Sequence, residues 1–324
     1  MNDHLSGLGR IGLLLLVLCG VASVTHAETY AEKLGWPAGA KVLILHVDDA
    51  GMSAESNAGT IDALEEGSAN SFSVMMPTPW VAQIVDYILA NPEVDAGLHL
   101  TLNAEWDDYR WVPLAGKAAV PGLVDREGAL WSSVEQVVEH ASADEVGREI
   151  AAQLDRALSM GFQPTHLDSH MGTLFASPEF LARYIELGVT NQLPVMFPGG
   201  HNYYARQDYG ERAGEEARVL GETIWEQGLP VLDDLHNASY GWKRQDKIAN
   251  YVAAIHGLRA GVTMMIMHCT AESEQFDLIS HSGPSRFGDL EAMLSDEVAR
   301  AINAAGVELT TWRELMQRRR QLQD

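Results

Sequence analysis

Apolar runs and amphipathic stretches alternate along the chain from about residue 41 onward. The run Lys41–Val47, KVLILHV, is almost entirely apolar, whereas Val146, Ile150, Leu154 and Leu158 repeat at one-turn spacing before a glycine. A short continuous apolar run is typical of a buried strand, and the one-turn period is typical of a helix that packs on a sheet. Further strands are predicted at residues 71–76, 95–102, 164–170, 193–197, 229–235, 261–268 and 306–312.

This alternation predicts the fold class. Helices are expected between the strands, for example from Ser53 to Gly67 and over residues 80–90, where Asn91-Pro92 ends the pattern. Strands that alternate with helices pair in parallel through crossover connections. The sequence therefore predicts an α/β fold, a variant TIM-like (β/α) barrel with seven or eight parallel strands. A doubly wound open sheet is the alternative.

One long irregular stretch interrupts the pattern, at residues 103–132. It contains Trp106, Tyr109, Trp111 and Trp131. Aromatic side chains in a loop at the mouth of a barrel can stack on sugars, but they can equally pack against the protein. The sequence leaves both interpretations open.

The amino terminus predicts export. Arg10 precedes the apolar run IGLLLLVLCGVASV, which is followed by THA and a polar segment. This pattern is typical of a signal peptide, residues 1–27, and the run is short for a membrane span. We expect a periplasmic or secreted protein with a single domain, residues 28–324. A lipoprotein at Cys19 is less favoured, because Leu18 stands directly before it, where a small residue is normally required.

Composition narrows the range of partners. The chain has 324 residues, 46% of them hydrophobic, and a formal net charge of -23 spread along its length. Such a field repels nucleic acid and anionic membranes, so we expect no nucleic-acid partner and no stable membrane insertion after cleavage of the leader. Cys269 would be the only cysteine left, which excludes an intramolecular disulfide, and its apolar context predicts a buried thiol. The oligomeric state stays open, with a homodimer possible.

Candidate chemistry gathers at the predicted strand ends. Asp and His residues stand at or near these ends: Asp48, Asp49, His99, His166, Asp168, His170 and His268. One strand-end His is usually a hydrogen-bonded rim residue, but several on different strands converge at the mouth of a parallel barrel. Two imidazoles and one carboxylate could hold a divalent metal with positions open for water and substrate.

The adjacent aspartates would then have different roles. Side chains alternate along a strand, so Asp48 and Asp49 can reach one site only if the chain bends after Val47, which Gly51 makes easier. One carboxylate could bind the metal while the other acts as general base toward a metal-activated water. Taken alone, the same residues also suit a plain turn that caps the helix at Ser53.

Several segments resemble the YdjC-like carbohydrate (chitooligosaccharide) deacetylase family. The resemblance is carried, in order, by HVDDAGMSAESNAGTI, SFSVMMPTPW, AGLHLTLN, PTHLDSHMG, MIMHC and SRFGDLEAM. It implies a TIM-like barrel and metal-dependent removal of an N-acetyl group from an acetylated sugar or oligosaccharide. By the family pattern, Asp48 is the general base, Asp49, His99 and His170 are the metal ligands, and His268 is a candidate acid or oxyanion partner.

The sequence also departs from the family pattern. His46 and Val47 replace the usual Asn-Ala before the two aspartates, Ala50 replaces an aromatic residue, Gly172 replaces a second His, and Cys269-Thr270 replace Pro-Gly after the late His. These changes leave the three implied ligands in place. They alter the neighbourhood of the pocket, so the sugar itself stays open.

The sequence leaves alternative functions, metals and site residues open. One rival is another metal hydrolase on the same scaffold, either a phosphoesterase or an amidase for non-sugar amides. The other is a non-catalytic glycan-binding protein, but a protein that only binds sugars would not need a general base such as Asp48. Two nitrogens and one oxygen favour Zn, although Co, Ni, Mn or Mg could be held. His166 is the substitute ligand, more typically a group that hydrogen-bonds Asp168 or the backbone. His281 competes with His268 but is expected to be a solvated loop residue.

Overall fold

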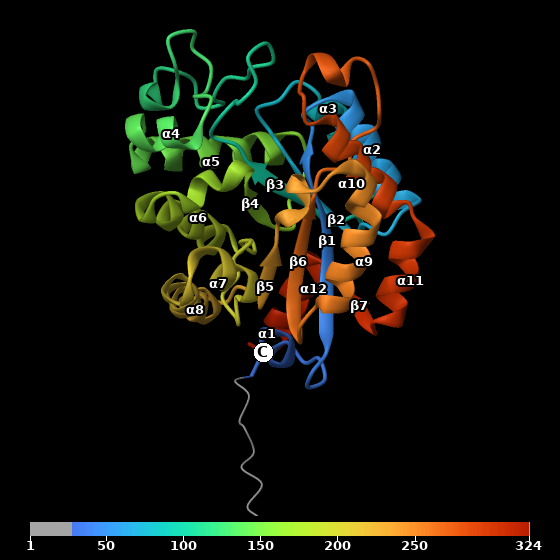
Figure 1. Cartoon of the computed structure of the whole chain (residues 1–324). Coiled ribbons are helices and arrows are strands. Elements are labelled where there is room, and N and C mark those ends of the chain that lie inside the picture. Colours follow the sequence, from blue (N-terminus) through green and yellow to red (C-terminus); the bar gives the residue numbers. More distant parts are fainter. Residues whose placement is uncertain (1–27, 324) are drawn as a thin grey trace, which may run out of the picture.

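A curled sheet of parallel strands forms the centre of the molecule (Figure 1). The computed structural model describes residues 28–323, so the predicted signal peptide lies outside the described residues. Within them the strands are β1 Lys41–Ala50, β2 Ser71–Val74, β3 Ala96–Leu100, β4 Leu167–Ser169, β5 Asp234–His236, β6 Gly261–Met267 and β7 Val307–Leu309. Their order is β4-β3-β2-β1-β6-β5, and β7 pairs with β1.

Residues 195–198 lie between the two edge strands of this sheet. Single parallel bridges join Leu167 to Val195 and Pro198 to Leu232, so the segment contacts β4 on one side and the approach to β5 on the other. The strand predicted at residues 193–197 is therefore not formed, and this region makes only the two single bridges. Because β4 and β5 meet across it, the chain forms the predicted α/β TIM-like barrel, and the doubly wound open sheet is wrong.

The strand β1 has different neighbours at its two ends. Its first residues, Lys41–Leu43, pair with β7, whereas His46, Val47 and Ala50 pair with β2. On its other side, β6 follows β1 from Lys41 to Val47. The long β1 is thus held on both sides up to the point where its two aspartates begin.

Helices surround the sheet (Figure 1). The α-helices are α1 Tyr30–Lys33, α2 Ala54–Glu65, α3 Val81–Ala90, α4 Val134–His140, α5 Ala143–Ser159, α6 Pro178–Asn191, α7 Tyr203–Tyr209, α8 Glu211–Glu226, α9 Lys247–Gly257, α10 Gly283–Met293, α11 Asp296–Ala304 and α12 Trp312–Gln321. Short 3-10 helices are η1 Pro121–Leu123, η2 His170–Phe175, η3 Ala238–Gly241, η4 Arg244–Asp246 and η5 Phe276–Leu278. None of the helices in residues 28–323 has the length and apolar character needed to cross a bilayer.

The sequence pattern locates several of these elements well. Ser53 caps α2 by accepting a hydrogen bond from the Ser56 amide, as the pattern predicted. On α5, Val146, Ile150 and Leu154 are buried, but Leu158 is 40% exposed, so the apolar stripe ends one turn earlier than expected. The side chain of Cys269 is buried, as predicted.

The long stretch 103–132 is ordered around packing contacts. It holds η1 and an isolated antiparallel bridge between Val124 and Leu130. Trp111 is buried and donates its indole N–H to the Asn103 carbonyl at 2.9 Å. Packing therefore accounts for Trp111, while Trp106, Tyr109 and Trp131 are only partly buried.

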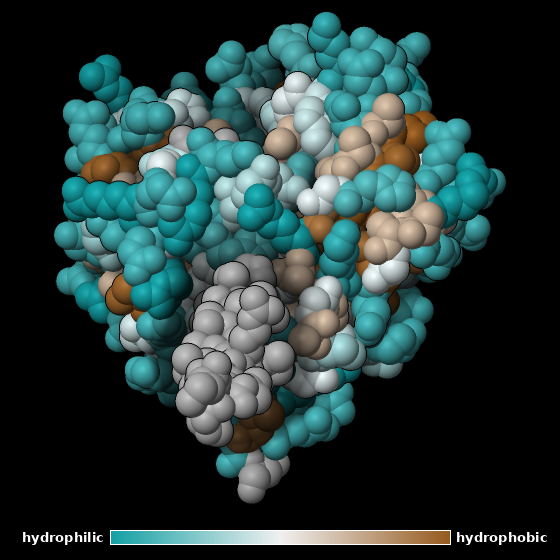
Figure 2. Space-filling view, turned by 60° about the horizontal axis from the view of Figure 1, so that its bottom comes forward, coloured by the Kyte–Doolittle hydropathy of each residue, from teal (hydrophilic) through white to brown (hydrophobic). Residues whose placement is uncertain are grey.

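The amino ends of the strands form the base of the barrel. The helix α1 closes this end, and α12 packs beside it. The Tyr30 ring contacts Trp225 with its plane tilted, and the Arg319 guanidinium lies over the same indole. Figure 2 shows this base turned forward, with hydrophilic side chains over most of its visible surface.

Candidate active site

A distortion at the end of β1 places both aspartates at the mouth of the barrel. The pairing of β1 with β2 shifts register between Val47 and Ala50, and Asp49 has a φ of 68°. A left-handed conformation is uncommon outside glycine, and Asp is among the residues that tolerate it. Neighbouring side chains on a regular strand point to opposite faces, so this bulge allows Asp48 and Asp49 to share one side.

The turn after the aspartates is held by Asn57. Its side-chain oxygen accepts a hydrogen bond from the Gly51 amide at 2.7 Å, and its amide group donates to the Trp80 carbonyl at 3.0 Å. Gly59, on the same helix, contacts the backbone of Thr270 so closely that a Cβ would lie 2.5 Å from its Cα. Asn57 and Gly59 therefore hold the turn that carries the two aspartates against its neighbours.

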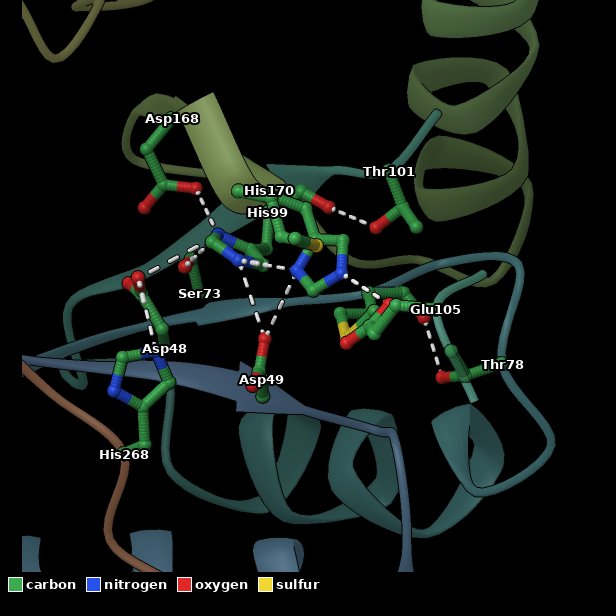
Figure 3. Close-up of polar contacts among 12 residues, drawn as sticks. Asp48, Asp49, Ser73, Thr78, His99, Thr101, Glu105, Asp168, His170 and His268 are labelled. Atoms are coloured by element: carbon green, nitrogen blue, oxygen red, sulfur yellow. Dashed lines mark hydrogen bonds and ion pairs between the residues drawn. The ribbon is translucent and has the colours of Figure 1, made fainter. Parts of the chain in front are cut away.

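Three side chains converge on one point (Figure 3): Asp49 from β1, His99 from β3, and His170 from the first position of η2, directly after β4. Asp49 Oδ1 lies 3.2 Å from His99 Nε2 and 3.3 Å from His170 Nδ1, and the two nitrogens are 3.2 Å apart. All three side chains are buried, and Asp49 Oδ1 accepts no hydrogen bond from any described residue. Ligand atoms about 2.1 Å from a tetrahedral metal are about 3.4 Å from one another. The three residues predicted as ligands therefore fit a divalent cation.

Each candidate ligand is oriented by a charged neighbour on its other side. The contacts are Asp49 Oδ2 with Arg286 Nη1 at 2.7 Å, His99 Nδ1 with Asp168 Oδ1 at 2.6 Å, and His170 Nε2 with Glu105 Oε2 at 3.0 Å. Partners of this kind fix the orientation of metal-binding side chains, and the two carboxylates also raise the basicity of the imidazoles that they contact. The free atoms of all three ligands are thus directed at the same place.

The charges of these neighbours control protonation. Burial opposes the charge on Asp49, but Arg286 and the two imidazoles outweigh it and hold the pKa of Asp49 well below its ordinary value. Burial likewise opposes a charged His170, but Glu105 and Asp49 raise its pKa to about 9. The pKa of His99 is raised well above its usual value, because Asp48 and Asp168 outweigh the effect of burial. A bound cation would take the place of these imidazole protons.

Asp48 and His268 stand beside this triad. Asp48 is 8% exposed, its Oδ1 accepts no hydrogen bond within residues 28–323, and its Oδ2 lies 3.9 Å from His268 Nε2. The backbone amide of His268 donates to Asp289 Oδ2 at 3.0 Å, and its ring lies 4.9 Å from that of Tyr240. Burial lowers the pKa of His268. The carboxylate can accept a proton, and the imidazole lies within reach of the same space.

The two other histidines considered from the sequence, His166 and His281, are not among these contacts. His166 is fully buried and stacks on Trp312, and its Nε2 is 3.8 Å from Asp168 Oδ2, too far for the predicted hydrogen bond. Its Nδ1 contacts the Thr165 hydroxyl at 3.0 Å instead. His281 is exposed in its loop, as expected.

Sequence reasoning did not identify Arg286 and Glu105 as parts of the site. Arg286 is buried on α10, far along the chain from Asp49, and Glu105 lies in the irregular stretch. The segment SRFGDLEAM was one available signal for Arg286. Glu105 has no comparable signal, because a lone acidic loop residue in an acidic chain does not stand out.

Comparisons with known proteins identify the family and several relatives of this chain. A family model described as YdjC-like protein matches residues 42–304. A carbohydrate deacetylase from Thermus thermophilus is 30% identical over 285 residues, 87% of this chain and 96% of the relative. A chitooligosaccharide deacetylase from Klebsiella pneumoniae is 32% identical over 284 residues, 85% of this chain and 99% of the relative.

One solved structure shares the fold over its whole length. It is described as a proposed cellobiose-phosphate cleavage protein from Enterococcus faecalis, with a TM-score of 0.71 and 21% identity. The match covers 85% of this chain and 99% of the other. This likeness supports the fold of the barrel and nothing finer.

Proposed function

Because the chain belongs to the YdjC-like protein family, we propose that it is a metal-dependent carbohydrate deacetylase. Its reaction would be hydrolysis of the N-acetyl group of an acetylated amino sugar or oligosaccharide. The observation that carries this proposal is the triangle of Asp49 Oδ1, His99 Nε2 and His170 Nδ1, with sides of 3.2 to 3.3 Å and the free Asp48 carboxylate beside it. The relatives named as deacetylases support the same reaction class.

The roles follow from the chemistry of each side chain. Asp49, His99 and His170 would hold a divalent cation, with Zn favoured by two nitrogens and one oxygen. Such an ion, when bound, polarises a carbonyl and lowers the pKa of a water. Asp48 receives the proton of the attacking water, because its carboxylate stands beside the triangle and its Oδ2 lies on the side of His268. His268, in its imidazolium form, donates a proton to the departing sugar nitrogen, so that the amine can leave.

The test combines metal analysis with a product assay. The purified protein should contain about one equivalent of a divalent metal and release acetate from N-acetylated sugars, with activity lost to a chelator and restored by Zn²⁺ or Co²⁺. Phosphate release from sugar phosphates, with no acetate release, would instead identify the phosphoesterase. Binding of acetylated sugars without acetate release would identify the glycan-binding protein.

We also propose that the protein is exported and loses residues 1–27. The support is the sequence pattern around Arg10 and the apolar run that follows it. Amino-terminal sequencing of the protein recovered from a periplasmic extract should begin at Glu28. A chain that keeps Met1 in that extract would contradict this proposal.

A further inference from the structure

A buried histidine beneath the site contacts Asp48 and Asp168, two carboxylates that are not among the candidate metal ligands. His46 lies two residues before Asp48 on β1 and is fully buried. Its Nε2 is 2.9 Å from Asp168 Oδ2 and 3.3 Å from Asp48 Oδ1. Both oxygens are buried and accept no hydrogen bond from a described residue. His46 is therefore the nearest positive partner of two otherwise uncompensated carboxylate oxygens.

The position of the His46 ring is fixed from below. Its Nδ1 lies 2.9 Å from Ser71 Oγ, and its Nε2 lies 3.1 Å from Ser73 Oγ. Both serines belong to β2, which pairs with β1 at this level through His46 and Ser71. The two hydroxyls hold the ring so that one nitrogen faces both carboxylates.

Each of these carboxylates leads to a different part of the site. Asp168 Oδ1 contacts His99 Nδ1 at 2.6 Å, so one path runs from His46 to a candidate metal ligand. Asp48 is the proposed general base, so the other path is direct. His46 is the one described residue that contacts both Asp168 and Asp48 at 3.3 Å or less.

The charges of the site require such a partner. Asp48, Asp49, Asp168 and Glu105 are four carboxylates, and Arg286 is the guanidinium among them. A divalent cation on the three ligands would leave one negative charge uncompensated in a buried setting, which is costly. A protonated His46 balances it, and Asp168 and Asp48 raise its pKa to about 9 against the effect of burial.

We propose that His46 is a positioning residue that holds the general base Asp48 and, through Asp168, the metal ligand His99 in a fixed relation to each other. The proposal rests on the proposed function for the role of Asp48, but its effect on metal binding does not require deacetylase activity. A residue of this kind typically changes metal affinity or turnover about 10- to 100-fold when it is replaced.

The experiment compares three replacements at His46 with a matched buried histidine. His46→Gln keeps a neutral N–H near the place of Nε2, His46→Asn places its amide near Nδ1 and loses both carboxylate contacts, and His46→Leu removes every polar contact. His166→Gln is the control, because His166 is equally buried and lies 3.8 Å from Asp168 Oδ2. The readouts are the Kd for Zn²⁺, measured by competition with a chromophoric chelator, and kcat and KM for acetate release.

The expected order of effects is specific. His46→Leu and His46→Asn should raise the Zn²⁺ Kd and lower kcat about 10- to 100-fold each with KM nearly unchanged, whereas His46→Gln should recover most of both losses. His166→Gln should leave both values close to those of the wild type. If His46→Leu does not fold, the contrast between Gln and Asn at this position carries the test.

Three results would overturn the proposal. Equal, wild-type Kd and kcat in the folded Asn and Gln variants would remove any positioning role. The same losses in His166→Gln would make the effect one of general packing. Two equivalents of Zn²⁺ in the wild type would make His46 a ligand, since its nitrogen, His166 and Asp168 offer atoms within 4.8 Å of one another. If the wild type released no acetate, the Zn²⁺ Kd would still decide the question, and the proposed function alone would fail.

Discussion

The two ends of the barrel use buried aspartates in opposite ways. At the base, Asp95 accepts hydrogen bonds from the backbone amides of Trp312 and Arg313, and Asp233 accepts three, from Tyr30, Ala31 and Val262. At the mouth, Oδ1 of Asp48 and Oδ1 of Asp49 accept none from described residues, and charged side chains surround them instead.

This difference indicates that the aspartates at the base stabilise the fold, whereas those at the mouth are available for catalysis. Backbone amides at the base occupy the lone pairs of the carboxylates and attach α1 and α12 to the strands. At the mouth, the lone pairs stay available to a cation or a proton. In barrels of this class, residues at the amino ends of strands serve stability and those at the carboxyl ends serve function. Changes at the two ends should therefore have separable effects.

The largest effect is expected from removal of a ligand at the mouth. His99→Ala or His170→Ala should reduce bound metal, measured by elemental analysis, to background and abolish acetate release. The melting temperature should stay within about 4 °C of the wild type, because the apolar core of the barrel is untouched. His281→Ala, an exposed loop histidine, should keep both metal and activity. Full metal occupancy in either ligand variant would contradict the assignment.

The next effect divides the two neighbouring aspartates. Asp48→Asn should retain the metal and lower kcat about 10²- to 10⁴-fold, because a positioned general base typically contributes that much. Asp49→Asn should weaken metal binding as well, since it removes the charge at the centre of the triangle. Metal analysis and kcat measured on both variants distinguish the roles. The reverse pattern would exchange them.

A smaller loss of rate is expected at His268. His268→Ala should bind metal normally and lower kcat about 10²-fold, at the lower end of the range for an acid catalyst, because Asp48 can donate the proton it took from the attacking water to the sugar nitrogen in place of His268. Measurement of kcat and of bound metal on the same sample tests this. Near-normal turnover would make His268 a rim residue held by Asp289 through its backbone.

At the base the expected loss is one of stability. Asp233→Ala leaves three backbone amides without their acceptor and should lower the free energy of unfolding by about 3 kcal/mol or more. Urea unfolding measures this, while kcat per folded molecule should stay unchanged. Asp155→Ala, at an exposed position on α5, is the control and should change neither value. A loss of kcat in the folded Asp233→Ala protein would break the distinction between the two ends.

The smallest expected effect is the pH dependence of Asp233. Burial raises the pKa of this carboxyl to about 6, whereas in the unfolded chain it lies near 4. Between these values the folded state binds more protons, so the stability contributed by Asp233 is present below about pH 4 and is lost as pH rises to 6. Relative to Asp233→Asn, the wild type should lose up to about 3 kcal/mol of unfolding free energy across this window. A constant difference between the two proteins in urea unfolding would refute it.

Sequence patterns predicted the strands that carry the site better than the residues that contact its candidate ligands. The apolar runs located β1, β3, β4 and β6, and parallel pairing then required their carboxyl ends to meet, so the Asp and His residues at these ends could be grouped in advance. The choice of Asp49, His99 and His170 among them came from the family resemblance. The single-domain boundary at residue 28 and the roles of the grouped residues stay predictions. Hydrophobic patterning within a short segment of sequence is enough to predict where a strand ends.

The supporting contacts depend on tertiary distances that no local pattern contains. Arg286 meets Asp49 across 237 positions of the chain, and Glu105 reaches His170 from an irregular segment. His46 was visible only as an unusual residue before the aspartates, because its role depends on Ser71, Ser73 and Asp168. The segment 193–197 was expected as a full strand, but it makes only the two single bridges.

The packing of α1 and α12 on Trp225 has a practical consequence. The first and last described segments of the chain, around Tyr30 and Arg319, meet on this one indole at the base. The candidate active site lies at the carboxyl ends of the strands, at the opposite end of the barrel. A fusion partner or a solid support joined to either segment would therefore be attached behind the barrel, and an immobilised protein would present its mouth to the solution.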